Sequence, residues 1–301
     1  MKRIRLIAVV GPTACGKSDF AVELALREGG EIVSCDSMQV YRGMDVGTAK
    51  PTGAERRGVP HHLIDVADPC EPFSVADYLE LASAAIREIA GRGRLPILCG
   101  GTGLYLDRLL AGGLAGETVA DPALRGELLA FAAQNGNEAL HSRLAGIDPE
   151  SAAAIHPNNV RRVARALEIY RLTGIPKSEW DRRSRAAESP YDAEVIGLER
   201  SREDLCRRIA LRVDRMLADG LVEETGRLER AGVFAVNRTA AQAIGYKEIL
   251  PFLHGECSLE EAAEALRIAT RQYAKRQLTW FRAKPYVRWR SADAPADGDL
   301  R

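Results

Sequence analysis

Three continuous apolar runs in the first third of the chain predict buried strands. They lie at residues 4–10, 31–36 and 94–102, and runs without polar alternation are typical of parallel strands covered on both faces. Between the second and third runs, Ser74 and Asp77 have the spacing of a capping box, and the apolar stripe that follows extends to Gly91. The order strand, helix, strand predicts a parallel sheet.

The pattern changes near Ala111, where several glycines interrupt it. From there to Pro190 the chain is rich in alanine and arginine, has a helical period and contains no predicted strand. Asn158 and Asn159 can cap one of these helices, which ends near Gly174. We therefore expect residues 111–190 to form an inserted, all-helical domain.

A strand at 194–198 is predicted to rejoin the first sheet. Helices are predicted to follow it at 201–219, 221–231, 239–253 and 258–283, and Ser258 with Glu261 forms a capping box at the start of the last one. We expect a core domain made of residues 1–110 and 191–290, followed by a flexible tail at 291–301.

Composition narrows the class of protein. The chain has 301 residues, 46% of them hydrophobic and 28% charged, which fits a globular protein of about two domains. Its 42 basic and 42 acidic residues balance, so any surface that attracts nucleic acid must be local. The six cysteines include no C-x-x-C pair, which argues against a zinc site and a secreted disulfide framework. No run reaches the roughly 18 apolar residues of a membrane span, and the first apolar run is too short for a signal peptide, so we expect a cytoplasmic protein.

A phosphate-binding loop follows the first predicted strand. Gly11, Pro12, Thr13, Ala14, Cys15, Gly16, Lys17 and Ser18 form the pattern G-x-x-x-x-G-K-S. In such a loop backbone N–H groups surround one anion, the lysine neutralises it and the serine hydroxyl can bind Mg²⁺. The predicted fold is therefore α/β: a P-loop NTPase-like parallel sheet flanked by helices, with the helical insertion and a helical C-terminal part. The loop does not reveal which di- or triphosphate it holds.

Asp36 ends the second apolar run, at the sheet edge where parallel α/β folds bind ligands. Three roles are open for it on position alone. It can bind Mg²⁺, act as a general base, or form an Asx turn.

An ordered set of motifs gives the chain a family resemblance. The stretch DSMQVYRGMDVGTAKP at 36–51, which follows the phosphate loop, resembles the bacterial tRNA dimethylallyltransferases. Further matching stretches cover nearly the whole chain: PHHLID at 60–65, GGTGLY at 100–105, HPNN at 156–159, RRVARALE at 161–168, the segment 208–217, QAIGYKE at 242–248 and RQYAKRQLTWFR at 271–282. Cys15 departs from the small residue, such as serine, that the family would lead us to expect, but this position contributes backbone.

The resemblance implies an alkyl transfer. The loop would hold the diphosphate of dimethylallyl diphosphate, and N6 of an adenine in tRNA would attack the allylic carbon and expel pyrophosphate. Lys17, Ser18 with Mg²⁺, and Arg212 would stabilise the departing charge. Asp36 would accept the proton of the amine, and Thr13 and Thr102 could supply hydroxyl groups.

The resemblance also implies a set of tRNA contacts around the anticodon stem-loop, with the target adenine directly 3′ of the anticodon. The base would have to leave its stack to reach a buried carbon. The residues so implied are Asp36, Ser37, Met38, Gln39, Thr102, Arg125, Arg161, Arg162, Val163, Ala164, Arg165, Ala241, Gln242, Ala243, Ile244, Gly245, Tyr246, Lys275, Arg276, Gln277 and Trp280.

Segment 265–290 is a candidate RNA surface on its own pattern. It has eight basic residues, no acidic residue and five interleaved aromatics, a combination that suits phosphate contacts with base stacking. Aromatics in the core and charges in solvent remain an equally good account of about half of them. The adjacent His61 and His62 would point to opposite faces of a strand, which argues against a metal site there.

Three rival functions remain beside the transferase that the resemblance implies. One is a P-loop kinase that uses ATP, and another is a prenyltransferase that acts on free adenine nucleotides. The third is a non-enzymatic, nucleotide-switched RNA-binding module, in which Asp36 would hold Mg²⁺. Under the main hypothesis we expect a monomer that needs Mg²⁺, dimethylallyl diphosphate and tRNA, and no membrane.

Overall fold

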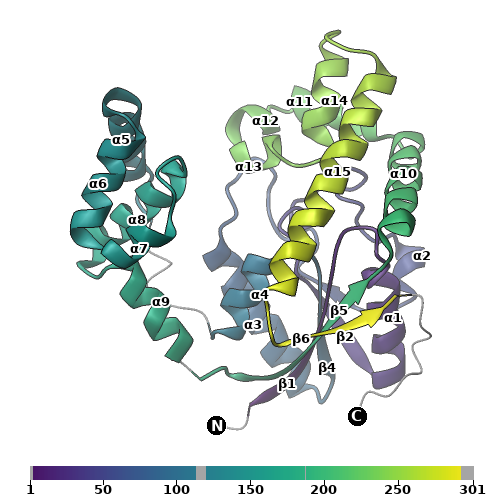
Figure 1. The fold of residues 1–301 in the computed structure, drawn as a ribbon. Helices are drawn as coiled ribbons and strands as arrows, with labels where there is room; N and C mark the ends of the chain where they lie inside the picture. The colour runs from purple at the N-terminus through teal and green to yellow at the C-terminus, as the bar shows by residue number, and fades with distance from the viewer. Residues whose placement is uncertain (1–2, 113–119, 187, 293–301) are drawn as a thin grey trace. The chain divides into compact units, whose positions relative to one another are not determined.

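The computed structural model describes residues 3–112, 120–186 and 188–292 (Figure 1). The chain divides into two compact units, one made of Met1–Asp107 with Tyr191–Arg301 and the other of Arg108–Pro190. The sequence placed these divisions at 110/111 and 190/191. Within the described part of the chain, no helix combines the length and the apolar character that a membrane crossing requires.

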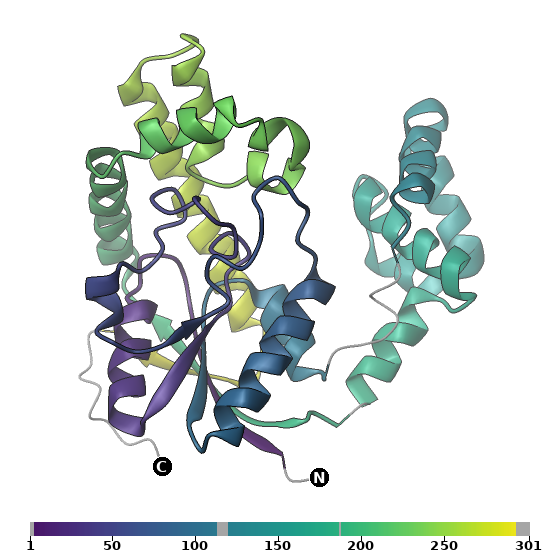
Figure 2. The same cartoon turned by 180° about the vertical axis from the view of Figure 1, so that it is seen from behind.

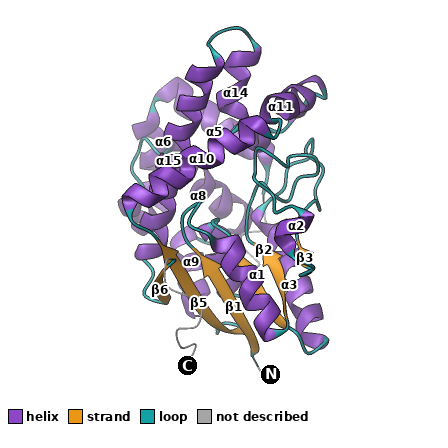
Figure 3. Cartoon of the chain, turned by 90° about the vertical axis from the view of Figure 1, so that its right-hand side faces the viewer, coloured by secondary structure: helices purple, strands orange, loops and turns teal. Residues whose placement is uncertain are grey.

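A six-stranded sheet forms the centre of the first unit, and all its strand pairs are parallel. Figure 3 shows its strands lying side by side in one twisted layer. The order across the sheet is β3 (His61–His62), β2 (Gly30–Ser34), β4 (Leu95–Cys99), β1 (Ile4–Val10), β5 (Tyr191–Glu199) and β6 (Val287–Ser291). The four predicted strands are confirmed, and so is the α/β class.

The register of the strands explains why the first apolar run is continuous. β1 lies between β4 and β5, with Val9 opposite Cys99 on one side and Ile196 on the other. Its last five residues are buried, since helices pack on the sheet. The carboxyl ends of β1, β2 and β4 consequently meet at one edge, where the loops of the candidate site begin.

Helices α1 (Lys17–Glu28) and α3 (Val75–Gly91) pack against the central strands and can be followed in Figure 2. The capping box predicted at Ser74 is present. After β4 comes α4 (Gly103–Leu110), and a short helix, α2 (Gly53–Arg56), precedes β3. One hydrophobic cluster joins the sheet to α1 and to the start of α10 (Arg202–Ala218).

A second hydrophobic cluster lies among the helices that follow β5. It joins the segment 40–46 to α10, α11 (Leu221–Arg230), α14 (Tyr246–Leu253) and α15 (Leu259–Arg282). The short helices α12 (Val233–Val236) and α13 (Arg238–Ala241) complete this layer. The capping box predicted at Ser258 opens α15, the long yellow helix of Figure 1.

Two expectations for the C-terminal part were wrong. The helix predicted at 239–253 is broken into α13 and α14, because Gly245 adopts a φ of 110° just before α14. The second is the strand β6, which was not predicted at all and pairs with the edge of β5. Of the expected tail 291–301, Ser291 belongs to β6 and residues 293–301 lie outside the described residues.

The second unit is helical throughout its described residues and has its own core. It contains α5 (Pro122–Asn135), α6 (Asn137–Ile147), α7 (Pro149–Ala154), α8 (Val160–Thr173) and α9 (Lys177–Ala186). Leucine and alanine side chains of α5 to α8 form its hydrophobic cluster. Asn159 occupies the N-cap position of α8, but its side chain makes no capping hydrogen bond.

Candidate active site

The phosphate loop connects β1 to α1 and turns through backbone conformations that side chains restrict. Gly11 has a φ of 142°, and a Cβ there would lie 2.4 Å from the carbonyl oxygen of Leu198. Only glycine therefore fits between the loop and β5. Helix α1 begins without a side-chain cap, so its first N–H groups are free to bind an anion. Lys17 Nζ lies across the loop and donates to the carbonyl of Pro12 at 2.7 Å.

Three arginines hold the loop from the opposite side. Arg200 Nε donates to the carbonyl of Cys15 at 2.8 Å, and Arg208 Nε donates to that of Ala14 at 2.9 Å. Arg212 Nη1 donates to Thr13 Oγ1 at 3.2 Å. Two loop carbonyls are thus bound by arginine. The sequence gave no reason to connect Arg200 or Arg208 with the loop, although the four-residue spacing of 208 and 212 places them on one face of a helix.

Arg212 is half-buried beside the loop and opposite a carboxylate. Loss of hydration lowers the pKa of its guanidinium, and the negative charge of Asp36 acts in the other direction. A guanidinium keeps its proton at any physiological pH. The structure thus brings a desolvated cation and Asp36 near the phosphate loop, where positive charge acts over short range with little screening.

Asp36 follows β2 and shapes the turn in which it lies. Its Oδ1 accepts hydrogen bonds from the N–H groups of Met38, at 2.9 Å, and Gln39, at 3.3 Å. The Asx-turn role considered for this residue is therefore present. Since both bonds use Oδ1, the second carboxylate oxygen is left for chemistry in the cavity. The turn accordingly orients the carboxylate without consuming it.

The end of β4 contributes a loop that touches both the turn and the phosphate loop. Thr102 Oγ1 accepts a hydrogen bond from the N–H of Ser37 at 3.1 Å, and the N–H of Thr102 donates to Cys35. Burial raises the pKa of the nearby Cys35 and Cys99 thiols to about 12, so both stay neutral. Cys15, the departure from the expected loop sequence, is fully buried in the core.

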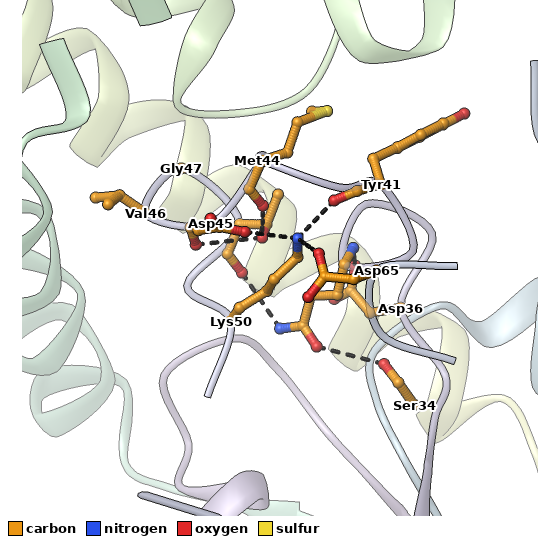
Figure 4. A network of polar contacts seen from close by, with 12 residues as sticks. Ser34, Asp36, Tyr41, Met44, Asp45, Val46, Gly47, Lys50 and Asp65 are labelled. Atoms are coloured by element: carbon orange, nitrogen blue, oxygen red, sulfur yellow. Dashed lines mark hydrogen bonds and ion pairs between the residues drawn. The ribbon is translucent and has the colours of Figure 1, made fainter. Parts of the chain in front are cut away.

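Figure 4 shows the polar network that fixes the segment after Asp36, with Lys50 at its centre. The Lys50 ammonium contacts Asp45, Asp65 and the backbone carbonyl of Tyr41. Gln39 Nε2 donates to the carbonyls of Thr48 and Ala49, both at 3.3 Å. The segment is thus tied back on itself around the Asp36 turn.

One cavity of about 320 Å³ brings these groups together. It joins a polar end, made by the phosphate loop and Arg212, to apolar side chains of several segments. Its lining includes Thr13, Lys17, Ser18, Asp36, Ser37, Met38, Gln39, Ile64, Gly100, Gly101, Arg212, Val213, Gln242, Ala243, Ile244, Tyr273, Arg276 and Gln277. Thr102, Ala241, Gly245, Lys275 and Trp280 lie beside these positions in sequence but do not line the cavity.

Some residues that the resemblance implied as tRNA contacts have no surface to offer. Val163, Ala164 and Tyr246 have no exposed area, so the expectation that they touch tRNA directly is wrong for this structure. They pack in the hydrophobic clusters of their units. Family ranges had been carried over whole, and the inward face of each helix came with them.

In the helical unit, Arg125 and Arg165 share one buried carboxylate. Glu168 has no exposed area and accepts hydrogen bonds from both guanidinium groups, from Arg125 at 2.9 and 3.0 Å and from Arg165 at 2.9 Å. Arg161 and Arg162 are exposed, and neither forms an ion pair with another described residue. The cations of this unit that are available for RNA are therefore these two.

The basic segment 265–290 is less positive in the fold than in the sequence. Most of its cations pair with acids of other elements or of its own: Arg267 with Asp214, Arg271 with Glu264, Arg282 with Glu199, Lys284 with Asp107 and Arg288 with Glu194. Phe281 is fully buried. Lys275 and Arg276 form no ion pair within the described residues, and Arg276 lies 5.7 Å from the Tyr273 ring centroid.

Comparison with known proteins decides the family. A model described as IPP transferase matches residues 39–284, and one described as isopentenyl transferase matches residues 4–67. The chain belongs to the IPP transferase family. The resemblance stated from the motifs is thereby confirmed.

Relatives of this IPP transferase match over nearly their whole length. A tRNA dimethylallyltransferase of Halalkalibacterium halodurans is 52% identical over 95% of this chain and 90% of that protein. One of Geobacter sulfurreducens is 50% identical over 99% of this chain and 94% of that protein. These relatives share both the phosphate-loop half and the C-terminal half with this chain.

Solved structures agree with this fold. The tRNA isopentenylpyrophosphate transferase of Bacillus halodurans has a TM-score of 0.71 and 51% identity, and the match covers 96% of this chain and 90% of that one. A eukaryotic dimethylallyltransferase described as acting on tRNA has a TM-score of 0.83 and 32% identity, over 96% and 74% of the two chains.

The donor groups at the phosphate loop suit Mg²⁺ only together with a phosphate. Among the residues that the structure describes, no cluster of three or more His, Cys, Asp or Glu side chains could hold a metal. The Ser18 side chain is exposed at the start of α1, and Mg²⁺ is commonly bound by one or two protein oxygens plus substrate phosphates. His61 and His62 instead bond to the carbonyl of Val59 and to Glu31.

Proposed function

We propose that this protein transfers the dimethylallyl group of dimethylallyl diphosphate to N6 of the adenine directly 3′ of the anticodon in tRNA. Membership of the IPP transferase family makes it a transferase. The observation that carries the proposal is one cavity that holds a phosphate loop, a desolvated arginine and a carboxylate. A leaving diphosphate and an attacking amine need those three groups.

The phosphate loop would hold the diphosphate while the allylic C–O bond breaks. Negative charge grows on the leaving oxygens in that step, and fixed N–H groups and cations stabilise it more than they stabilise the bound ester. Lys17 and Arg212 supply the positive charge. Ser18 is the residue placed to bind Mg²⁺, which would supply further charge neutralisation when bound.

Asp36 would accept the proton that the amine loses as its bond to carbon forms. The N6 lone pair attacks the allylic carbon, the C–O electron pair leaves with pyrophosphate, and one N–H proton passes to the free carboxylate oxygen. A carboxylate with an ordinary pKa is ionised at neutral pH and can take up this proton. Thr102 supports the step indirectly, because its hydroxyl fixes the turn through Ser37.

Recognition of tRNA would rest on the few cations that no acid neutralises. Arg276 and Lys275 lie on α15, and Arg276 lines the cavity. Arg161 and Arg162 begin α8 in the helical unit. An adenine that presents N6 to the cavity must leave its stack, and flanking phosphates then need such contacts. We infer that the protein meets its tRNA in the cytoplasm and as a monomer, which light scattering of the purified protein can test.

The direct test incubates purified protein with Mg²⁺, dimethylallyl diphosphate and unmodified tRNA, and weighs the digested nucleosides. The expected product is adenosine heavier by one dimethylallyl group in place of one hydrogen. Parallel reactions replace the diphosphate with ATP, or the tRNA with AMP. Phosphate transfer from ATP, or prenylation of AMP but not of tRNA, would support a rival function instead.

The role of Asp36 has its own matched variant. Asp36→Asn keeps the Oδ1 acceptor that two backbone N–H groups use but removes the charge that accepts a proton. We expect turnover to fall by about 10² to 10⁴, the usual contribution of a general base, while the melting temperature and tRNA affinity stay close to wild type. Full turnover in this variant, measured by the nucleoside assay, would refute the general-base role.

A further inference from the structure

Gln277 lies in the middle of α15, and its side chain bridges two loops of the cavity. Its Oε1 accepts a hydrogen bond from the N–H of Thr13 at 2.8 Å. Its Nε2 donates to the carbonyl of Gly101 at 3.1 Å. The residue is only 5% exposed, so both ends of the amide are engaged inside the protein and little of it is available to RNA.

The loop after β4 is shaped around this side chain. A Cβ on Gly101 would lie 2.0 Å from Gln277 Nε2, a distance that no real side chain tolerates. The orientation of the amide is also determined, because a carbonyl needs the NH₂ end and an N–H group needs the oxygen end. Each of these features ties the position of α15 to the backbone of the two loops.

Thr13 is consequently held at two points. Gln277 accepts from its N–H, and Arg212 donates to its hydroxyl. On the other side, Gly101 precedes Thr102, whose hydroxyl fixes the Asp36 turn through Ser37. One glutamine thus joins the loop that would bind the diphosphate to the loop that orients the carboxylate.

We propose that Gln277 is a positioning residue for the diphosphate site and not an RNA contact. It fixes the backbone at Thr13 in the conformation that the anion requires, so its loss weakens diphosphate binding in particular. This inference rests on the proposed function for the identity of the ligand. It revises the expectation, drawn from the resemblance, that Gln277 touches tRNA.

Gln277→Met tests the proposal, because methionine has a similar length and cannot form either hydrogen bond. Gln272→Met is the matched control: the same change on the same helix, at an exposed position. Calorimetry measures the affinity of each variant for inorganic pyrophosphate with Mg²⁺, and steady-state kinetics gives KM for dimethylallyl diphosphate and for tRNA separately. Thermal melting reports the fold.

For Gln277→Met we expect pyrophosphate affinity to fall about tenfold, as the loss of a buried hydrogen bond predicts. KM for dimethylallyl diphosphate should rise by a similar factor, whereas KM for tRNA should change less than twofold. Gln272→Met should match wild type in all of these. Gln277→Asn, which is too short to span both loops, should repeat the diphosphate effect and serves if the methionine variant does not fold.

Two results would overturn the proposal. A raised KM for tRNA with unchanged pyrophosphate affinity would restore the RNA contact, and a lower melting temperature with unchanged pyrophosphate affinity and unchanged KM values would show a merely structural role. The calorimetric arm does not depend on turnover. Wild-type protein that binds pyrophosphate but makes no prenylated nucleoside would therefore count against the proposed function alone.

Discussion

At the scale of single residues, side chains that take no part in chemistry hold those that would. Glu224 of α11 is 3% exposed, and its carboxylate accepts three consecutive backbone N–H groups, those of Asp45, Val46 and Gly47, at 3.1, 3.0 and 2.9 Å. The hydroxyl of Tyr246 donates to the same carboxylate at 2.8 Å. A buried charge is tolerated because four donors surround it. The segment after Asp36 is thereby fastened to the helical layer.

Replacing this carboxylate should be costly. Glu224→Ala leaves three amides and a phenol buried without an acceptor, and each unsatisfied group costs roughly 1–3 kcal/mol. We expect the free energy of unfolding, measured in urea, to fall by about 3 kcal/mol or more. Tyr246→Phe removes one donor only and should cost about 1 kcal/mol. An unchanged urea midpoint for Glu224→Ala would show that the three amides find water instead.

At the scale of elements, local pattern predicted those that local forces stabilise. β1 begins and ends where the apolar run does, and α3 and α15 open at the capping boxes that Ser74 and Ser258 announce. By contrast β6 alternates charged and apolar residues and exists because β5 offers it an edge. Such a pairing is a tertiary contact, and no local signal encodes it.

The candidate site divides in the same way. The phosphate loop and Asp36 could be found in the sequence, because a glycine pattern and the end of an apolar run mark them. The arginines that bind the loop carbonyls, and Gln277 between the loops, come from segments nearly 200 residues or more away in the chain. Their roles depend on how helices pack on the sheet, which periodicity alone does not reveal.

The break between α13 and α14 can be tested at one residue. Gly245 has a φ of 110°, and a Cβ there would lie 3.1 Å from the carbonyl oxygen of Gly47. Gly245→Ala should lower the free energy of unfolding by about 2 kcal/mol, from backbone strain together with the close contact. Gly255→Ala is the control, since its φ is 74° and nothing lies within 4 Å of the added carbon; about 1 kcal/mol is expected. Equal losses in urea unfolding would refute the contribution of the Gly47 contact.

At the scale of the whole molecule, attraction to RNA has to come from position and not from net charge. The 42 basic and 42 acidic residues cancel, and ion pairs neutralise most of the basic segment 265–290. A polyanion then responds to the cations that remain unpaired. Arg161 and Arg162 are such cations in the helical unit, whereas Arg182 and Arg183 of the same unit pair with Glu179.

This contrast yields a prediction about salt. Each phosphate contact releases counterions, so the logarithm of the binding constant falls with the logarithm of salt concentration in proportion to the contacts made. The double variant Arg161→Ala and Arg162→Ala should bind tRNA more weakly, and the salt slope should become shallower by about 1.5 to 2. Filter binding at several salt concentrations gives both quantities.

The matched control is the double variant Arg182→Ala and Arg183→Ala, which removes the same formal charge from the same unit. Because Glu179 already engages these two guanidinium groups, and Glu150 engages Arg182 as well, their removal leaves carboxylates unpaired but takes away no free cation. We expect a salt slope within about 0.5 of wild type. If both double variants reduced the slope equally, the helical unit would be acting through its total charge, and the distinction between paired and unpaired arginines would have no bearing on RNA binding.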